Sequence, residues 1–591
     1  MARVNGAETA GFSAVAVIGL LVFFYGGTFL ISSRIGKKNE NADAYMTAGN
    51  NVGFGISAAS MTATWIWASS MYASATSGYT YGISGPIHYG LWGALMILFI
   101  YPFGKRIREV APKAHTLAEV MYARHGRSSQ LMLAGSNVVG SVISLMSNFI
   151  AGGVLISLLS PFNFIQGVFT VAAGVLLYTL WSGFRASVLT DFIQVVAMLG
   201  AVAVIVPFIF FAAGFPAAFE SGAGNLTSQQ GSFFSSEAFM NQGAPYIAAV
   251  LAYAIGNQTI AQRLFAVKQS LIKPTFITAT VGYGAMVIGI GMLGVLALYL
   301  GVEPTNGDMN NLIPQMAAEY LPPVLLALFF IMIIGALSST ADSDLSALSS
   351  ITMADVYGQN VAGKEKANPR TMLLVGRLTM VAATAVAVAF ASLQLSILDL
   401  LVFVGALWGA LVFPVLASFY WGKVSGRAFT TAVTAALVVF LPVRFSWIPT
   451  DGLFGLVVDV LSVIGIGVLL GLMVFGFAGA KPAKIVGTLA ALASAPFAIG
   501  SLHEYATLCG SLVAYSVSTI VCWSMSVRRE DSFDFALLSQ RTGDFDEADA
   551  QTTTNGPDCD GRADGDADGG KPAEPTGPTG TPGTTDTAEP K

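Results

Sequence analysis

Charged residues are scarce in this sequence. Only 11% of its 591 residues are Asp, Glu, Lys or Arg, whereas 54% are hydrophobic and 64 are glycine. A typical globular domain carries about twice that share of charge. The composition therefore argues against a domain that folds in water and predicts a polytopic membrane protein.

The sequence also has little of what a metal centre or a covalent enzyme needs. Its three cysteines occur late in the chain without the spacing of metal ligands, and its four histidines form no ligand pair. We find no Walker-type phosphate loop and no nucleophile paired with a base. We therefore expect no enzyme, no organic cofactor and no nucleic-acid partner.

Long apolar segments dominate the rest of the chain, and each can cross a hydrocarbon core of about 30 Å. The first is too long for a signal-peptide core, so we predict that it is retained. The last two could form one hairpin against the bundle, so we predict an all-α protein with about 13–15 transmembrane helices. The segments are 11–33, 50–78, 86–104, 130–157, 163–183, 187–214, 244–266, 275–302, 320–352, 371–394, 398–421, 428–447, 455–478, 484–501 and 505–527.

Basic residues fall in alternate loops. If the N-terminus is outside, the loops on the outer side hold only Arg3 and Arg444, and the other loops hold the remaining positive charge. This asymmetry follows the positive-inside rule and predicts a multi-pass protein of the cell membrane with a cytoplasmic C-terminus. Arg263 is assigned to one of the basic cytoplasmic loops. We expect no Lys or Arg in a central cavity.

The end of the chain has a different composition. Residues 530–591 carry 15 acidic and 4 basic residues and are rich in Gly, Pro and Thr. Such a segment cannot bury enough apolar surface to fold, so we predict a disordered acidic cytoplasmic tail.

A hydroxyl-rich stretch follows the apolar run at 324–334. Its serines share one face at helical spacing: Ser339, Ser343, Ser346 and Ser350. Asp342 and Asp344 lie among them. Small hydroxyl residues also serve plain helix packing, but ionisable groups at membrane depth mark an ion or solute path. We predict such a path here.

Two apolar segments carry signs of an interrupted helix. Thr64-Trp65-Ile66-Trp67 lies in the middle of the second segment, and Gly256-Asn257-Gln258 lies in the seventh. Broken helices at matching places in two halves indicate a transporter site between inverted repeats. We therefore divide the chain into an extra N-terminal helix and loop (1–48), two five-helix repeats (49–215 and 244–425), extra C-terminal helices (426–529) and the tail (530–591).

Three stretches resemble motifs of the sodium:solute symporter family: Tyr178 to Gln194, Asn257-Gln258-x-x-x-Gln262-Arg263, and Ser338 to Tyr357. The resemblance covers roughly residues 11–478. It implies a leucine-transporter-like fold with a 5+5 inverted repeat and extra helices at both ends. It also implies a symporter that couples a small-molecule solute to Na⁺ by alternating access across the lipid bilayer.

The same resemblance implies a main Na⁺ site between the second and ninth helices. Its ligands would be carbonyl oxygens of Ala63, Ile66 and Ala336 and hydroxyls of Ser339 and Thr340. Some members bind a second cation near the aspartate that is Asp191 here, and the matching partners are Ser339, Asp342 and Ser343. Asp342 replaces the usual hydroxyl. Its carboxylate could strengthen that site, carry a proton, or act only as a structural hydrogen-bond acceptor.

The solute is less well defined. Thr64 to Ala68, Tyr81 to Pro86 and Lys113 to Thr116 resemble the urea-active branch of the family, as does an acid at Asp344. We expect the side chains of Trp65 and Trp67 to face a central cavity, although they could simply pack against neighbours.

The amides of Asn257 and Gln258 would lie opposite these tryptophans and suit urea or a similar small amide. Proline, another osmolyte and a monocarboxylate remain open as solutes. A membrane sensor that uses a symporter-like domain remains open as a function.

Overall fold

Helices make up almost all of the structure, a computed structural model that describes residues 11–35, 42–363, 367–449 and 452–543. Within these residues, eleven helices are long and apolar enough to cross a membrane. The other four predicted segments coincide with two broken helices, the apolar stretch Phe164–Leu180 and one further helix at 480–498. The prediction of an all-α polytopic membrane protein is confirmed.

The helices of the N-terminal half precede and form the first predicted repeat. They are α1 (Ala14–Ile35), α2 (Ala42–Thr47), α3 (Phe54–Trp65), α4 (Ala68–Tyr81), α5 (Ser84–Leu98), α6 (Ile100–Val110), α7 (Leu117–His125), α8 (Arg127–Leu159) and α9 (Phe164–Ala212). The 49-residue α9 carries two of the predicted segments. The connection to the second half contains α10 (Ala217–Gly222), α11 (Ser236–Ala238) and the π-helical η2 (Phe239–Gly243).

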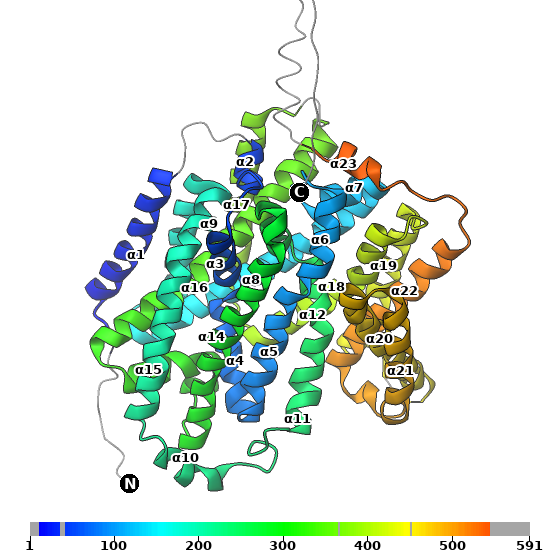
Figure 1. Ribbon diagram of the computed structural model, residues 1–591. Coiled ribbons are helices and arrows are strands. Elements are labelled where there is room, and N and C mark those ends of the chain that lie inside the picture. Colours follow the sequence, from blue (N-terminus) through cyan, green and yellow to red (C-terminus); the bar gives the residue numbers. More distant parts are fainter. Residues whose placement is uncertain (1–10, 36–41, 364–366, 450–451, 544–591) are drawn as a thin grey trace, which may run out of the picture. The chain divides into compact units, whose positions relative to one another are not determined.

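The second half has the same kind of order. Its helices are α12 (Ala244–Gly256), α13 (Gln258–Ala266), α14 (Ile272–Leu300), α15 (Leu312–Tyr320), α16 (Pro323–Ser350) with its π-helical extension η6 (Ile351–Val361), α17 (Pro369–Ala391) and α18 (Ile397–Tyr420). The last group comprises α19 (Gly426–Arg444), α20 (Leu453–Ala478), α21 (Ala480–Ala498), α22 (Ala506–Val527) and α23 (Ala536–Arg541). In Figure 1, α19 to α22 lie together at one side of the bundle and α1 lies at the other.

The two predicted interruptions are present. Between α3 and α4 the backbone leaves the helix at Ile66 (φ −79°, ψ 80°) and Trp67 (φ −74°, ψ 140°). Between α12 and α13 it leaves the helix at Asn257 (φ −93°, ψ 118°), whose side chain caps α13 by accepting from the Thr259 amide at 2.7 Å. At both breaks, backbone groups in the interior therefore lack their usual helical partners.

The start of the first broken helix and the end of the second are also joined. The Val52 amide donates to the Ala266 carbonyl at 3.0 Å, and the Lys268 amide donates to the Val52 carbonyl at 3.2 Å. These bonds form an isolated parallel bridge between Val52 and Val267. The segment that leads into α3 is thus tied to the segment that leaves α13.

Helix α16 is buried along most of its length. It packs against α3, α8, α9 and α17 (Figure 1). Every residue from Phe329 to Ser350 is buried except Ile331, although this stretch includes two aspartates and six serines. Polar groups in such surroundings are stable only when they are hydrogen-bonded inside the protein.

The start of the predicted disordered tail is ordered. Helix α23 packs against α6 and α7, and Leu538 is fully buried. The Phe533 ring lies 4.1 Å from the Arg124 guanidinium carbon, and Arg541 donates to the Ala123 carbonyl at 3.0 Å. The prediction of disorder is therefore wrong for residues 532–542, because two phenylalanines and a leucine give this short segment an apolar anchor. Residues 544–591 lie outside the described part of the chain.

His125, at the end of α7, lies in the same region. Its Nε2 is 2.7 Å from the Ser418 hydroxyl, and its ring packs against Phe429 at 5.6 Å between centroids. Burial lowers the pKa of His125 to about 3, and the charges of Arg124 and Arg529 act in the same direction. The folded protein therefore keeps this ring neutral.

Replacing the ring by an amide tests this conclusion. His125→Gln keeps a donor for Ser418 but cannot take up a proton. Because the folded pKa lies below the ordinary value of 6.5, the stabilising contribution of His125 is present above that pH and is lost as the pH falls towards the folded pKa. We expect the melting temperature of the variant in detergent to fall less than that of the wild type when the pH is lowered to 5. Equal losses would contradict a buried neutral His125.

Candidate cation and solute site

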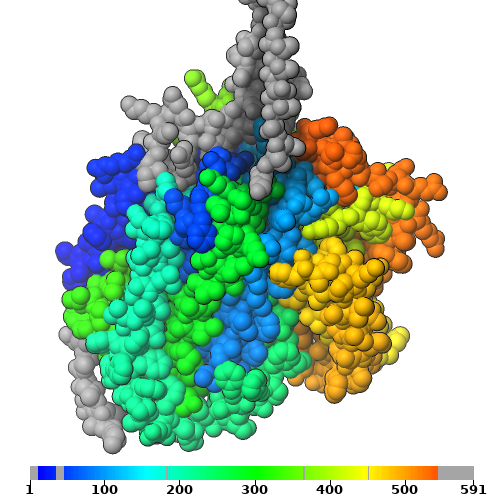
Figure 2. All heavy atoms as spheres, in the orientation of Figure 1, coloured from blue at the N-terminus to red at the C-terminus, as the bar shows by residue number. Residues whose placement is uncertain are grey.

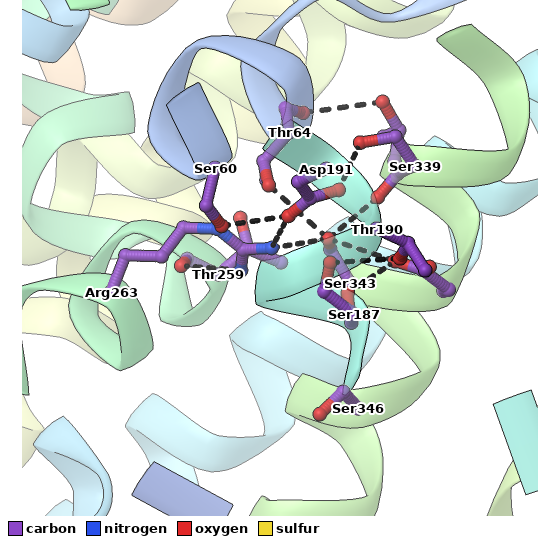
Figure 3. Close-up of polar contacts among 12 residues, drawn as sticks. Ser60, Thr64, Ser187, Thr190, Asp191, Thr259, Arg263, Ser339, Ser343 and Ser346 are labelled. Atoms are coloured by element: carbon purple, nitrogen blue, oxygen red, sulfur yellow. Dashed lines mark hydrogen bonds and ion pairs between the residues drawn. The ribbon is translucent and has the colours of Figure 1, made fainter. Parts of the chain in front are cut away.

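The unwound end of α3 touches the hydroxyl face of α16. The Thr340 hydroxyl donates to the Thr64 carbonyl at 3.1 Å, and the hydroxyls of Thr64 and Ser343 lie 3.2 Å apart. Figure 3 shows Thr64 directed towards the turn of α16 that carries Ser339. The two helices come from different predicted repeats, so this contact joins the two halves.

The break in α3 leaves carbonyl groups available at this contact. In a continuous helix the Ala63 carbonyl would accept from the Trp67 amide. Here the Trp67 amide donates to the Trp65 carbonyl instead, at 3.0 Å. In a continuous helix the Ser70 amide would donate to the Ile66 carbonyl. Here it donates to the Trp67 carbonyl, at 3.0 Å. Unwound carbonyls of this kind coordinate Na⁺ in inverted-repeat transporters.

All five residues predicted for the main Na⁺ site are buried. Ala63, Ile66, Ala336 and Ser339 have no exposed surface, and Thr340 is 1% exposed. The predicted oxygen ligands lie on adjoining elements, at the end of α3 and on α16. These oxygens are neutral, which suits a hard monovalent cation. Their role as ligands remains a prediction.

Asp191 of α9 lies at the centre of a second polar cluster. Its carboxylate accepts from the hydroxyls of Ser60 at 2.7 Å and Ser339 at 2.6 Å. It also forms an ion pair with Arg263 at 3.2 Å, and Arg263 donates to the Ser343 hydroxyl at 2.6 Å (Figure 3). The cluster therefore joins α3, α9, α13 and α16, and the predicted partners Ser339 and Ser343 are both part of it.

Arg263 was assigned from the sequence to a cytoplasmic loop, and that assignment is wrong. The residue is 4% exposed, and it lies on α13, all of whose residues are buried. Its guanidinium also lies over the Phe184 ring at 5.2 Å. The sequence did contain a signal for this buried position. Arg263 follows the predicted break at Asn257 by only six residues, which is too few for the chain to leave the bundle.

Asp342 has a different environment from Asp191. Its carboxylate accepts from Tyr178 at 2.8 Å, Ser187 at 2.7 Å and Ser343 at 3.2 Å. Tyr178 and Ser187 were not predicted as site residues, although both lie in the stretch that resembles the family motif. Among the side chains that the structure describes, none forms an ion pair with Asp342.

Asp344 points to another helix. It accepts from the Ser144 hydroxyl of α8 at 2.5 Å and is 2% exposed. Asp191, Asp342 and Asp344 thus place three carboxyl groups in the interior, whereas Arg263 is the only basic side chain ion-paired with them among the described residues. Buried acids in excess of buried bases favour the binding of cations or protons.

The two predicted tryptophans line a small cavity of about 20 Å³. Trp65 and Trp67 form its wall together with Tyr89, Tyr246, Tyr253 and Tyr283. The indole of Trp65 donates to the Gly93 carbonyl at 3.1 Å, whereas the buried Nε1 of Trp67 has no hydrogen-bond partner in the described part of the chain. The volume is that of about one water molecule, so an organic solute requires some of these rings to move.

Asn257 and Gln258 are directed elsewhere. The Asn257 side chain accepts from the amide and the hydroxyl of Thr259, at 2.7 and 2.6 Å. The Gln258 side chain accepts from the Leu117 amide at 3.2 Å and donates to the His115 carbonyl at 3.3 Å. Neither residue lines the aromatic cavity, so the structure does not bring the predicted amides and tryptophans together.

Broken helices that meet a polar intact helix inside a bundle of apolar helices are features of the inverted-repeat class of membrane transporters. The chain belongs to the sodium:solute symporter family, which matches residues 45–434. It is a multi-pass membrane protein, and the members of this family are transporters rather than enzymes.

Individual relatives are distant. The chain is 24% identical to the probable urea active transporter 1 of Schizosaccharomyces pombe over 412 residues, which cover 63% of this chain and 60% of that protein. It is 25% identical to a high-affinity proline transporter of Bacillus subtilis over 68% of this chain and 87% of the relative. A solved Na⁺-coupled sialic acid symporter, captured substrate-bound and outward-open, superposes with a TM-score of 0.58 at 18% identity, covering 81% of this chain and 97% of that one. This last likeness concerns the fold.

The ion pair between Arg263 and Asp191 has a measurable consequence. Arg263→Gln or Asp191→Asn alone leaves one buried charge without its partner, which typically costs about 3–5 kcal/mol. We expect both single variants to lower the melting temperature in detergent strongly and the double variant to lower it less than the sum. Arg427→Gln, which changes an exposed arginine, is the control. Additive losses in the double variant would show that the two charges do not depend on each other.

Proposed function

We propose that the protein is a Na⁺-coupled secondary active symporter that imports a small polar solute, urea or a similar small amide, by alternating access. The observation that carries this proposal is the contact between the unwound end of α3 and the hydroxyl face of α16. At this contact, backbone carbonyls that have lost their helical partners lie beside buried hydroxyls, at a junction between two repeats. Family membership supports the same function.

The coupling follows from the position of this junction. Ala63 and Ile66 belong to one repeat, whereas Ser339 and Thr340 belong to the other. A cation held by both sets of oxygens would stabilise the arrangement in which α3 lies against α16. Loss of the cation would weaken that contact and allow the repeats to move relative to each other.

The aromatic cavity supports a small neutral solute. The unpaired Nε1–H of Trp67 is a buried donor that a carbonyl oxygen can satisfy. No basic side chain lines this cavity within the described residues, so a carboxylate solute lacks a charge partner there. The resemblance to a relative named as a urea active transporter also supports urea.

Removing single hydroxyls tests the Na⁺ site. Ser339→Ala and Thr340→Ala each delete one proposed ligand, so we expect Na⁺-dependent uptake of labelled urea into proteoliposomes to fall at least tenfold, in line with about 1.4 kcal/mol or more per lost contact. Thr352→Ala is the matched control, because the Thr352 hydroxyl bonds only carbonyls of its own helix, those of Leu348 and Ser349. Uptake that is independent of Na⁺ and insensitive to both site variants would overturn the proposal.

Proton coupling is a second candidate, favoured by one observation. Asp342 accepts three hydroxyl hydrogen bonds and has no ion pair among the described side chains. Because no described Lys or Arg is paired with this carboxyl group, its protonation leaves no buried basic side chain without a partner. In this alternative, H⁺ replaces Na⁺ as the coupling ion.

Imposed gradients distinguish the two candidates. If Na⁺ is the coupling ion, an inward proton gradient without Na⁺ will drive no urea uptake in proteoliposomes, and Asp342→Asn will retain Na⁺-driven uptake. If H⁺ is the coupling ion, the proton gradient alone will drive uptake, and both Asp342→Asn and Asp342→Ser will abolish it. Asp342→Ser restores the hydroxyl expected in the family and so separates loss of the acid from loss of a hydrogen-bonding group.

A further inference from the structure

An apolar groove of about 590 Å³ lies away from the proposed transport site, between α18 and α22 on one side and α20 and α21 on the other. Its walls are mainly aliphatic and aromatic, and include Leu416, Val468 and Leu472. The volume is comparable to that of sites for small organic ligands. Segment 453–498, which supplies one wall, is the gold region at the right of Figure 2.

Helix α21 leaves this groove open because it packs principally against α20. The two helices approach closely at glycines: a side chain at Gly467 would lie 2.7 Å from the Gly487 carbonyl oxygen. The outward side of α21 is exposed, with Ile485 61% and Leu492 66% accessible. In a membrane these surfaces face lipid.

The groove has the depth of one leaflet. Along α20 it extends from Ile464 to Phe475, a span of eleven helical steps, which is about 16 Å at the helical rise and about half of a 30 Å hydrocarbon core. A partner transmembrane helix would cross both leaflets and needs a width of about 10–12 Å. A single acyl chain fits this depth better than a protein helix does.

One end of the groove carries the groups that a lipid headgroup requires. Tyr420 and Trp421 lie there, and such residues favour the membrane interface. Lys484, in the second turn of α21, also lines the groove and is exposed, with no acidic partner among the described residues. The hydroxyl of Thr519 in the wall is buried and has no hydrogen-bond partner among the described residues, so it can donate to a polar atom of a bound lipid.

We propose that this groove binds one acyl chain of an anionic phospholipid, with the headgroup phosphate at Lys484. A basic residue at the mouth of a pocket between transmembrane helices selects anionic lipid headgroups over zwitterionic ones. The site lies on α18 and on the helices that follow the second repeat. It therefore does not depend on which solute or ion the protein transports.

Native mass spectrometry of the delipidated full chain, titrated with phosphatidylglycerol or with phosphatidylcholine of the same acyl chains, tests the site. We expect one phosphatidylglycerol to be retained per chain, and Lys484→Gln to lower its affinity about fivefold. Lys481→Gln is the matched control, since Lys481 lies one turn earlier on the same helix and does not line the groove. Val468→Trp, which fills the groove, should remove both lipids.

Several results would overturn this proposal. Equal retention of the two lipids by the wild type would exclude selection by charge. An unchanged affinity in Lys484→Gln, or an equal loss in Lys481→Gln, would exclude the assigned headgroup position. A dimer of the chain that forms in place of the lipid complex would show that a second copy covers the groove.

Discussion

Backbone polar groups inside a membrane must be satisfied by the protein itself, and the rest of this structure depends on how the break in α3 meets that requirement. The carbonyl of Thr64 accepts from Thr340 of α16. The hydroxyl face of α16 is therefore needed where α3 unwinds. An interruption that would be unstable against lipid becomes a polar junction between the two repeats.

The two buried aspartates near this junction have different hydrogen-bonding and charge partners. Asp191 has the guanidinium of Arg263, whereas Asp342 is held by hydroxyl groups. Because Arg263 and Ser339 both bind Asp191, any cation that approaches this carboxylate competes with groups already attached to it. The proposed main Na⁺ site shares Ser339 with this carboxylate but otherwise uses neutral oxygens of other residues, which makes reversible binding and release easier to reconcile with a closed bundle.

Most of the helical segments and both helix breaks could be predicted from the sequence, because apolar length and the runs Thr64 to Trp67 and Gly256 to Gln258 are local signals. The surroundings of individual polar side chains could not. Arg263 looks like a loop residue until the whole of α13 is known to be buried, and Gln258 looks like a solute ligand until Leu117 and His115 are known to be its partners. Similarly, the acidic composition of the tail concealed the few apolar residues that dock α23. Non-local contacts decided each of these cases.

The backbone bridge between Val52 and Val267 has a mechanical consequence. It fastens the start of one discontinuous helix to the end of the other through two backbone hydrogen bonds, so that α3 and α13 are coupled at these ends. If one of them tilts, the other is pulled in the same sense unless both bonds break. Opening towards one side of the membrane would then involve α3 and α13 simultaneously, which favours an all-or-none change over independent flexing of each helix.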